Sequence, residues 1–415
     1  MKLIGYSFTG LSLFFFLTRA MALELIFDQP IEVTTVHGKN IFHHLESAGR
    51  RNIAASENFI AITWEDNRNG IPSIYLAKKK IDDKTFQQDI KISNAGEAFE
   101  PSIIALSNNR FVVAWEENTK LYARVVGETV IGPIYKVEDK ESGQVSLAHT
   151  DDKVFISYSR RESVFGRVML QQLQVKQFEL KQISAACPID IQPVKDEQLY
   201  PAITTTDSSL IVAWEDRRPG HTIIMAAMSK KNLPCGFNPP ERISMQSRRS
   251  QNQNQSQNQN RYGKGHGVSR VALATYGTGK VLATWADKRI FREGYDIYAA
   301  EHEPHGKSFF GPNSKVQDEF GGIAQQWHTT VSGNSNGNIF VAWDDNRNGD
   351  TDILLSWKEE NLWSEDLVIE DASGPGEQNH PSIVVDMLGM IHVVWIHRDS
   401  IGGNTRIRYL QRKAE

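Results

Sequence analysis

A carboxylate and a guanidinium recur at a fixed distance after four of the tryptophans in this sequence. Asp lies two residues and Arg four residues after each of them. The sets are Trp64, Asp66 and Arg68; Trp214, Asp216 and Arg218; Trp285, Asp287 and Arg289; and Trp343, Asp345 and Arg347. A ring of such pairs could bind an anionic ligand, but a bidentate Arg–carboxylate pair also secures turns or ties elements together. Because the same pair is repeated, we expect the structural role.

A second group of residues differs from repeat to repeat, as chemistry usually requires. Each precedes a Pro-Ser-Ile sequence or a variant of it, such as Pro101-Ser-Ile103. Aligning the repeats gives this set: Arg50, Glu100, Gln144, Tyr200, Val268, His328 and His380. Trp327 lies beside His328 and can offer an aromatic face to a sugar or a peptide. Loops on a rigid scaffold are the usual carriers of binding, so we expect a ligand pocket here. The alternative is a set of solvated loop residues.

The chemistry of this second group is open. Glu100 with His328 or His380 could act as acid and base, and the same residue types could hold a divalent metal. Neither pattern is specific, because the residues come from separate repeats. The sequence has no phosphate-cradling Gly loop, no Gly-x-Ser-x-Gly elbow and no His-Glu-x-x-His motif. We therefore assign no catalytic residue, no metal site and no cofactor.

The elements that must position these residues are strands. Alternating, β-branched runs such as Arg110–Trp115 end on aromatic anchors, and this pattern is typical of a half-buried strand. The anchors are Trp64, Trp115, Tyr158, Trp214, Trp285, Trp343 and Trp395, at spacings of 43 to 71 residues. A strand precedes each anchor run and two more follow it, with turn-forming Asp, Asn and Gly between them. Helical periodicity is absent after the N-terminal segment.

Four antiparallel strands repeated at this period predict an all-β fold, a β-propeller, with seven blades. Rejecting Tyr158 as an anchor would give six. The last repeat ends after its third strand, Thr405–Leu410, while residues 30–35 resemble a fourth strand without a blade. We expect this N-terminal strand to complete the C-terminal blade and close the ring. The alternative is a flexible N-terminus.

Three further segments carry predictions. Lys2, the apolar residues 3–17 and Ala20-Met21-Ala22 predict a signal peptide over residues 1–22, followed by one propeller domain over 23–415. The polar tract at about 247–267 predicts a mobile loop between blades. Cys187 and Cys235, in neighbouring repeats of an exported chain, could form a disulfide or stay unpaired.

The phrase Trp-Glu-Asp-Asn-Arg-Asn-Gly followed by Ile-Tyr, at residues 64–75, resembles the repeats of two exported propeller groups. These are the TolB-type periplasmic propellers and the sialidase-like propellers. The resemblance covers nearly the whole chain after residue 22 and implies architecture more than function. The sialidase Asp-box is incomplete, since Gly306-Lys-Ser308-Phe309 keeps its Gly, hydroxyl and aromatic residue without the Asp. No Arg-Ile-Pro motif is present either, so the sialidase catalytic residues cannot be carried over.

Charge and composition narrow the function. The net charge is −4 and no basic stretch occurs, which argues against nucleic acid as a partner. The sequence favours a monomeric, exported propeller, periplasmic or secreted, without a membrane span after signal cleavage. We expect it to bind a protein, peptide or glycan at the mouth of its channel, without catalysis. The alternative is a sialidase-like glycoside hydrolase acting on extracellular or periplasmic glycans.

Overall fold

The structure is a computed structural model and describes residues 25–45, 51–230, 233–245, 267–290, 294–306, 308–318, 323–359, 361–400 and 402–412. The expected signal peptide, almost all of the polar tract and Arg50 lie outside these residues. In the part of the chain that is described, no helix has the length and apolar character needed to cross a bilayer.

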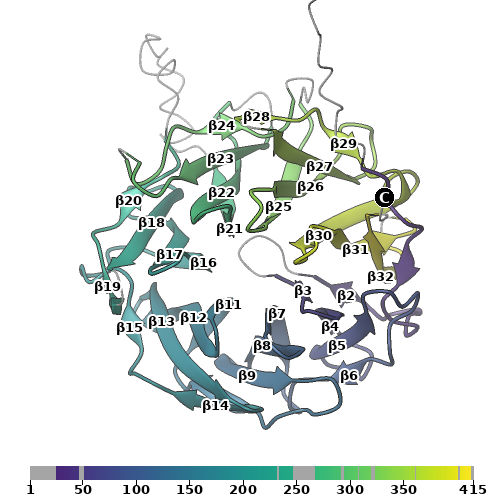
Figure 1. Ribbon diagram of the computed structural model, residues 1–415, viewed down its shortest axis with the longest axis horizontal. Helices are drawn as coiled ribbons and strands as arrows, with labels where there is room; N and C mark the ends of the chain where they lie inside the picture. Colours follow the sequence, from purple (N-terminus) through teal and green to yellow (C-terminus); the bar gives the residue numbers. More distant parts are fainter. Residues whose placement is uncertain are drawn as a thin grey trace, which may run out of the picture.

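Seven β-sheets stand in a ring around a central axis (Figure 1). We number these blades along the chain. Blade 1 comprises β2 (His43–His44), β3 (Ile53–Ala55), β4 (Phe59–Asp66), β5 (Ser73–Lys80) and β6 (Ile90–Lys91). In this blade the short strands β2 and β3 are innermost, and in the other six the first long strand takes this place. Blade 2 comprises β7 (Ala98–Leu106), β8 (Arg110–Glu117), β9 (Lys120–Val126) and β10 (Tyr135–Glu138). Blade 3 comprises β11 (Ser142–Thr150), β12 (Lys153–Glu162), β13 (Phe165–Lys176), β14 (Glu179–Gln182) and β15 (Cys187–Pro188).

The remaining four blades follow the same antiparallel order. Blade 4 comprises β16 (Gln198–Thr205), β17 (Leu210–Asp216), β18 (Ile223–Lys230), β19 (Leu233–Phe237) and β20 (Glu241–Arg242). Blade 5 comprises β21 (Val268–Tyr276), β22 (Lys280–Asp287), β23 (Asp296–His302) and β24 (Ser314–Lys315). Blade 6 comprises β25 (Gln326–Gly333), β26 (Ile339–Asp345), β27 (Asp352–Glu359), β28 (Leu362–Trp363) and β29 (Leu367–Val368). Blade 7 comprises β30 (Glu377–Val385), β31 (Ile391–Arg398), β32 (Thr405–Gln411) and the N-terminal β1 (Ile31–Glu32).

The seven aromatic anchors explain why the blades stack. Each anchor has a fully buried side chain on the second strand of its blade. Trp64 packs with Val394 and Ile396 of the blade before it in the ring, and Trp285 packs with Ile211 and Ala213 of blade 4. Each blade thus covers an apolar face of the blade before it, which no isolated blade could bury.

Tyr158 behaves as an anchor of the same kind. Its ring lies in the cluster between blades 2 and 3, with Val112 and Ala114 of β8. Its hydroxyl donates to Glu138 Oε2 at 3.0 Å. The prediction of seven blades is confirmed, and the six-bladed alternative is excluded.

The N-terminal strand closes the ring, as the sequence predicts. β1 pairs with β32 in antiparallel register, Ile31 opposite Tyr409. The backbone N–H groups of Asp28 and Val33 donate to the carbonyl oxygens of Gln411 and Ile407 at 2.8 and 3.0 Å. Blade 7 is therefore built from both ends of the described chain.

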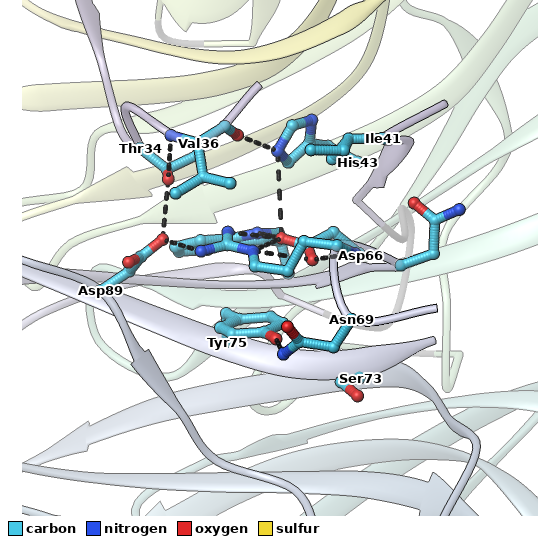
Figure 2. A network of polar contacts seen from close by, with 12 residues as sticks. Thr34, Val36, Ile41, His43, Asp66, Asn69, Ser73, Tyr75 and Asp89 are labelled. Atoms are coloured by element: carbon cyan, nitrogen blue, oxygen red, sulfur yellow. Dashed lines mark hydrogen bonds and ion pairs between the residues drawn. The ribbon is translucent and has the colours of Figure 1, made fainter. Parts of the chain in front are cut away.

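A polar network joins this closing strand to blade 1 (Figure 2). Thr34 Oγ1 donates a hydrogen bond to Asp89 Oδ2 at 2.7 Å. Asp89 Oδ2 also accepts a hydrogen bond from Arg68 Nη1 at 2.8 Å. His43 lies between blades 1 and 7, with Nε2 at 3.0 Å from the Val36 carbonyl oxygen and Nδ1 at 3.1 Å from that of Thr405. Burial of this ring lowers the pKa of His43. The network ties the N-terminal segment to blades on both sides of the seam.

Blades 3 and 4 carry a covalent link on their outer edge. Cys187 of β15 and Cys235 of β19 form a disulfide, with Cα atoms 5.9 Å apart. In the ring, this pair stands on the side away from the seam between blades 7 and 1 (Figure 1).

Candidate functional site

The repeated Trp-x-Asp-x-Arg residues are engaged with one another. In each set, the Trp Nε1 donates a hydrogen bond to the carboxylate of the Asp two residues later. The N···O distances are 2.9 Å to Asp66, 3.0 Å to both Asp216 and Asp287, and 3.1 Å to Asp345. The Arg of the same set lies 2.5 to 2.7 Å from that carboxylate in all four blades. The four carboxylates are almost completely buried. The geometry matches a turn-securing role and leaves no face of the carboxylates open to a ligand.

Two of these arginines also reach into the preceding blade. Arg218 of blade 4 pairs with Asp190 after β15 at 2.7 Å, and Arg347 of blade 6 pairs with Asp318 after β24 at 3.3 Å. Such charge-assisted contacts tie neighbouring blades together.

The second group of candidates occupies a shared backbone irregularity. In six of the inner strands the pairing register shifts near the strand's start, as between Phe99 and Ser102 of β7. The residue at each shift has a positive φ: Glu100 at 52°, Gln144 at 62°, Tyr200 at 50°, Arg270 at 59°, His328 at 44° and His380 at 53°. Left-handed backbone is uncommon for residues with a Cβ, and it costs about 1 kcal/mol or more each. β-Bulges of this kind re-aim side chains, and here they do so at the mouth of the channel.

One member of the predicted set is wrong. Val268 does not occupy the bulge of blade 5, because its side chain packs in the core between blades 4 and 5. Arg270 holds the bulge instead. The bulge of blade 5 lies two residues later than the sequence alignment placed it, because Val268 is the first residue of β21 and Arg270 the third.

Histidines from three blades meet on one side of the mouth. His328 of blade 6 stacks on His380 of blade 7 with ring centroids 3.9 Å apart, and His44 of blade 1 meets the edge of His380 at 4.9 Å. His328 Nδ1 lies 2.6 Å from Asp344 Oδ2, and the backbone N–H of His380 donates to the same oxygen at 3.0 Å. Burial opposes the ionisation of Asp344, but these two histidines outweigh it and lower the pKa of Asp344. The result is an imidazole held against a buried, ionised carboxylate.

Aromatic faces flank this histidine group. Trp327 packs against Tyr295 with ring centroids 4.0 Å apart and lies 6.4 Å from His328. Both aromatic side chains are only partly buried. On the neighbouring side, the Arg270 guanidinium covers the Tyr200 ring at 3.6 Å. The mouth therefore offers flat apolar surfaces among polar groups.

Sequence reasoning missed a set of acidic residues that hold the bulges. Asp344 is one, and Glu215 accepts the backbone N–H of Arg270 at 2.8 Å. Glu65 accepts that of Glu100 at 3.3 Å, and Glu116 accepts that of Gln144. Each of these acids directly follows an anchor tryptophan of the preceding blade. This constant position, one residue after the tryptophan, could have predicted these acids from the sequence. Only the Asp two residues and the Arg four residues after the tryptophan were considered from this motif.

A pocket of about 590 Å³ opens at the mouth among blades 2, 3 and 4. Glu100 and Gln144 both line it. The charged residues of its wall are Glu97, Glu100, Glu116, Glu141, Glu197, Arg161 and Arg217. Arg161 is already paired with Glu141 and Glu197, at 3.5 and 3.3 Å. The wall thus carries an excess of negative charge.

No metal centre emerges from this geometry. Over the described residues, no group of three or more His, Cys, Asp and Glu side chains is arranged to hold an ion. His328 and His380 stack on each other and His44 meets the edge of His380, which is not the convergent arrangement of a ligand set.

Comparisons with known proteins find similar folds among solved structures. No protein-family model matches the sequence, and no curated protein matches it. Among solved structures, the polysaccharide lyase Uly1 is similar with a TM-score of 0.55 and 10% identity, covering 87% of this chain and 89% of the lyase. A GH93 α-L-arabinofuranosidase of Fusarium graminearum, solved with arabinobiose, is similar with a TM-score of 0.48 and 11% identity, covering 76% of this chain and 93% of that chain. At these identities the likeness shows the propeller architecture.

Proposed function

We propose that this propeller binds a glycan across the mouth of its channel. The observation that carries the proposal is the ring of bulges, where positive-φ backbone is kept in six blades at residues of five different types. Strain of this kind persists where the surrounding structure over-determines it, and it clusters at ligand sites. A pocket with several polar groups and nearby aromatic faces suits a sugar, which has both hydroxyls and apolar C–H faces.

The charge of the mouth narrows the class of glycan. The pocket among blades 2, 3 and 4 has five glutamates against two arginines on its wall. An acidic sugar would meet repulsion there, whereas a neutral or basic sugar would not. This charge favours a neutral or basic glycan over a sialic acid.

The binding proposal is tested at Trp327. Trp327→Ala is expected to weaken glycan affinity about tenfold or more, because it removes the aromatic face beside the histidines. A glycan array identifies ligands, and calorimetry measures their dissociation constants for wild type and variant. Trp363→Ala is the matched control, since Trp363 lies on the outer strand β28 of the same blade. Equal affinity of wild type and Trp327→Ala for every ligand found would contradict the proposal.

A second candidate, cleavage of the bound glycan, is favoured by the His328–Asp344 pair. A buried carboxylate on Nδ1 fixes the orientation of an imidazole and stabilises its protonated form, which suits the imidazole to proton transfer. Such a group could serve hydrolysis, as in glycoside hydrolases. Elimination, as in a polysaccharide lyase like the similar structure Uly1, would need a sugar whose C5–H is acidified by a carboxyl group, which the charge of the mouth disfavours. The products distinguish these reactions, because only elimination leaves an unsaturated sugar that absorbs ultraviolet light.

We also propose that the chain is exported. The signal-like residues 1–22 and the Cys187–Cys235 disulfide support this, since disulfides persist in oxidising compartments. The expected mature protein begins at Leu23, which mass spectrometry of protein secreted or released from its native host would detect. Recovery of the chain only in reduced form with an intact N-terminus would contradict export.

A further inference from the structure

One arginine crosses the central channel. Arg51 lies just before β3 of blade 1, and its Nη2 donates to the carbonyl oxygen of Leu273 in blade 5 at 2.8 Å. Its backbone carbonyl accepts the N–H of Ile103 in blade 2, which fixes its place in the ring. The equivalent residues of the other blades, each one after the bulge position, are Pro101, Val145, Pro201, Val271, Thr329 and Pro381. Arg51 is the single cation at this level of the channel within the described residues.

A polar cavity of about 180 Å³ lies against Arg51, on the side away from the mouth. Its walls come from the middle and end of the inner strands: Ile104, Leu147, Ala148, His149, Ile203, Thr204, Thr205, Ala274, Thr275, Ser332 and Gly333. No carboxylate stands in this described lining. At about 30 Å³ for each water, the cavity has room for a small ion with several waters.

The guanidinium is therefore a cation on a half-buried side chain, with no carboxylate partner among the described residues. Burial lowers the pKa of Arg51, but an arginine stays charged in proteins, so it cannot relieve the cost of burial by losing its proton. Buried charges are normally paired, and among the described residues the pairing here is one backbone carbonyl. An anion would supply the missing charge.

The neighbouring side chains agree with an anion more than with a cation. Ser332 Oγ accepts the backbone N–H of Val385 at 3.0 Å, which leaves the Ser332 hydroxyl able to donate into the cavity. Thr275 Oγ1 donates to the carbonyl oxygen of Thr205 and is joined by Thr204 Oγ1 at 2.8 Å, so these hydroxyls satisfy one another. Burial first, and in smaller part the charge of Arg51, lower the pKa of His149, so this ring adds no second positive charge at neutral pH.

We propose that this cavity binds a small inorganic anion, such as a halide or nitrate, on the Arg51 guanidinium with the Ser332 hydroxyl as a second donor. The site is separate from the mouth and does not depend on the glycan proposal. Its role is to complete the charge balance at the axis of the ring.

Thermal unfolding of the full chain tests the site without any glycan. Sodium gluconate is replaced by sodium chloride, bromide or nitrate at constant ionic strength. Wild type is expected to gain about 2 °C or more in Tm, in a saturating manner, once the anion exceeds its dissociation constant about tenfold. Arg51→Met, which keeps the length of the side chain without its charge, is expected to lose this anion-specific gain. An equal gain in wild type and Arg51→Met would overturn the proposal.

Bromide diffraction locates the ion directly, whether or not Arg51→Met folds. Crystals of the wild type grown in bromide are expected to show an anomalous peak in the cavity beside Arg51. A cavity that contains only water under these conditions would overturn the proposal. Glycan binding is also measured in gluconate and in chloride. Equal glycan affinity in the two salts would show that the mouth and the anion site are independent, so that failure of one proposal would not affect the other.

Discussion

A chain that begins at His37 is expected to lose most of its folding stability relative to a chain that begins at Leu23. The shorter chain lacks β1 and the flanking residues that pair with β32, so the edge of blade 7 is open. The lost contacts include the buried side chains of Leu25 and Val33 and the backbone bonds to Gln411 and Ile407. At about 2 kcal/mol for each buried side chain and about 1 kcal/mol for each hydrogen bond, the expected loss is about 5 kcal/mol or more.

Urea unfolding followed by tryptophan fluorescence measures this loss. The chain beginning at Leu23 is the matched control, because it keeps every described residue. Thr34→Val in that longer chain separates the polar network from strand pairing, since it removes the hydrogen bond to Asp89 and the one that Thr34 Oγ1 accepts from the Val36 N–H, and leaves β1 in place. We expect this variant to lose about 1 to 2 kcal/mol. Equal unfolding midpoints for the two chain lengths would show that β1 does not hold the ring closed.

Replacing His328 by Ala is expected to lower the turnover of any glycan that the mouth cleaves by about 10²- to 10⁴-fold. The variant removes the imidazole that Asp344 orients at 2.6 Å. Asp344→Asn is expected to cause a similar loss, because the amide cannot stabilise a protonated imidazole as the carboxylate does. Binding of the same glycan, measured in parallel, is expected to change much less than turnover.

Rates of product formation, with wild type and variants at equal concentration, decide this second prediction. His305→Ala serves as the control, since His305 lies exposed in an outer turn of blade 5. A wild type that binds glycans but releases no product from them would reject cleavage and leave binding alone. Unchanged turnover in His328→Ala would remove His328 from the chemistry.

The sequence allowed the architecture to be predicted because each blade repeats one physical requirement. A large aromatic residue on the second strand must fill the space against the blade before it, so Trp64 and its equivalents recur once in every blade. The residues near Pro30 have the pattern of a strand without a blade, and the last repeat lacks its fourth strand. Because each blade needs four strands, these two observations together predicted that the N-terminal strand completes the last blade. Strand alternation and edge pairing are local properties that survive in a single sequence.

The site was only partly predictable because its geometry depends on backbone register. Five of the six bulge residues were found by their place before the Pro-Ser-Ile sequence or its variants, whereas Arg270 was missed because the alignment of blade 5 was set two residues too early, on Val268. The bond from Asp344 to His328 joins residues 16 positions apart and needs the shifted pairing of β25 with β26. The hydrogen bond from Arg51 to Leu273 joins opposite sides of the ring, and no spacing of residues in the sequence predicts such a contact.

The arginine that spans the ring also limits how a polymer can be handled. With the Arg51 side chain bonded from blade 1 to Leu273 of blade 5, the axis is barred below the mouth. If the mouth binds a polysaccharide as proposed, this contact prevents the polymer from passing through the ring from end to end. It has to lie over one face, arriving and departing from the same side, so internal segments of a chain are as accessible as its termini.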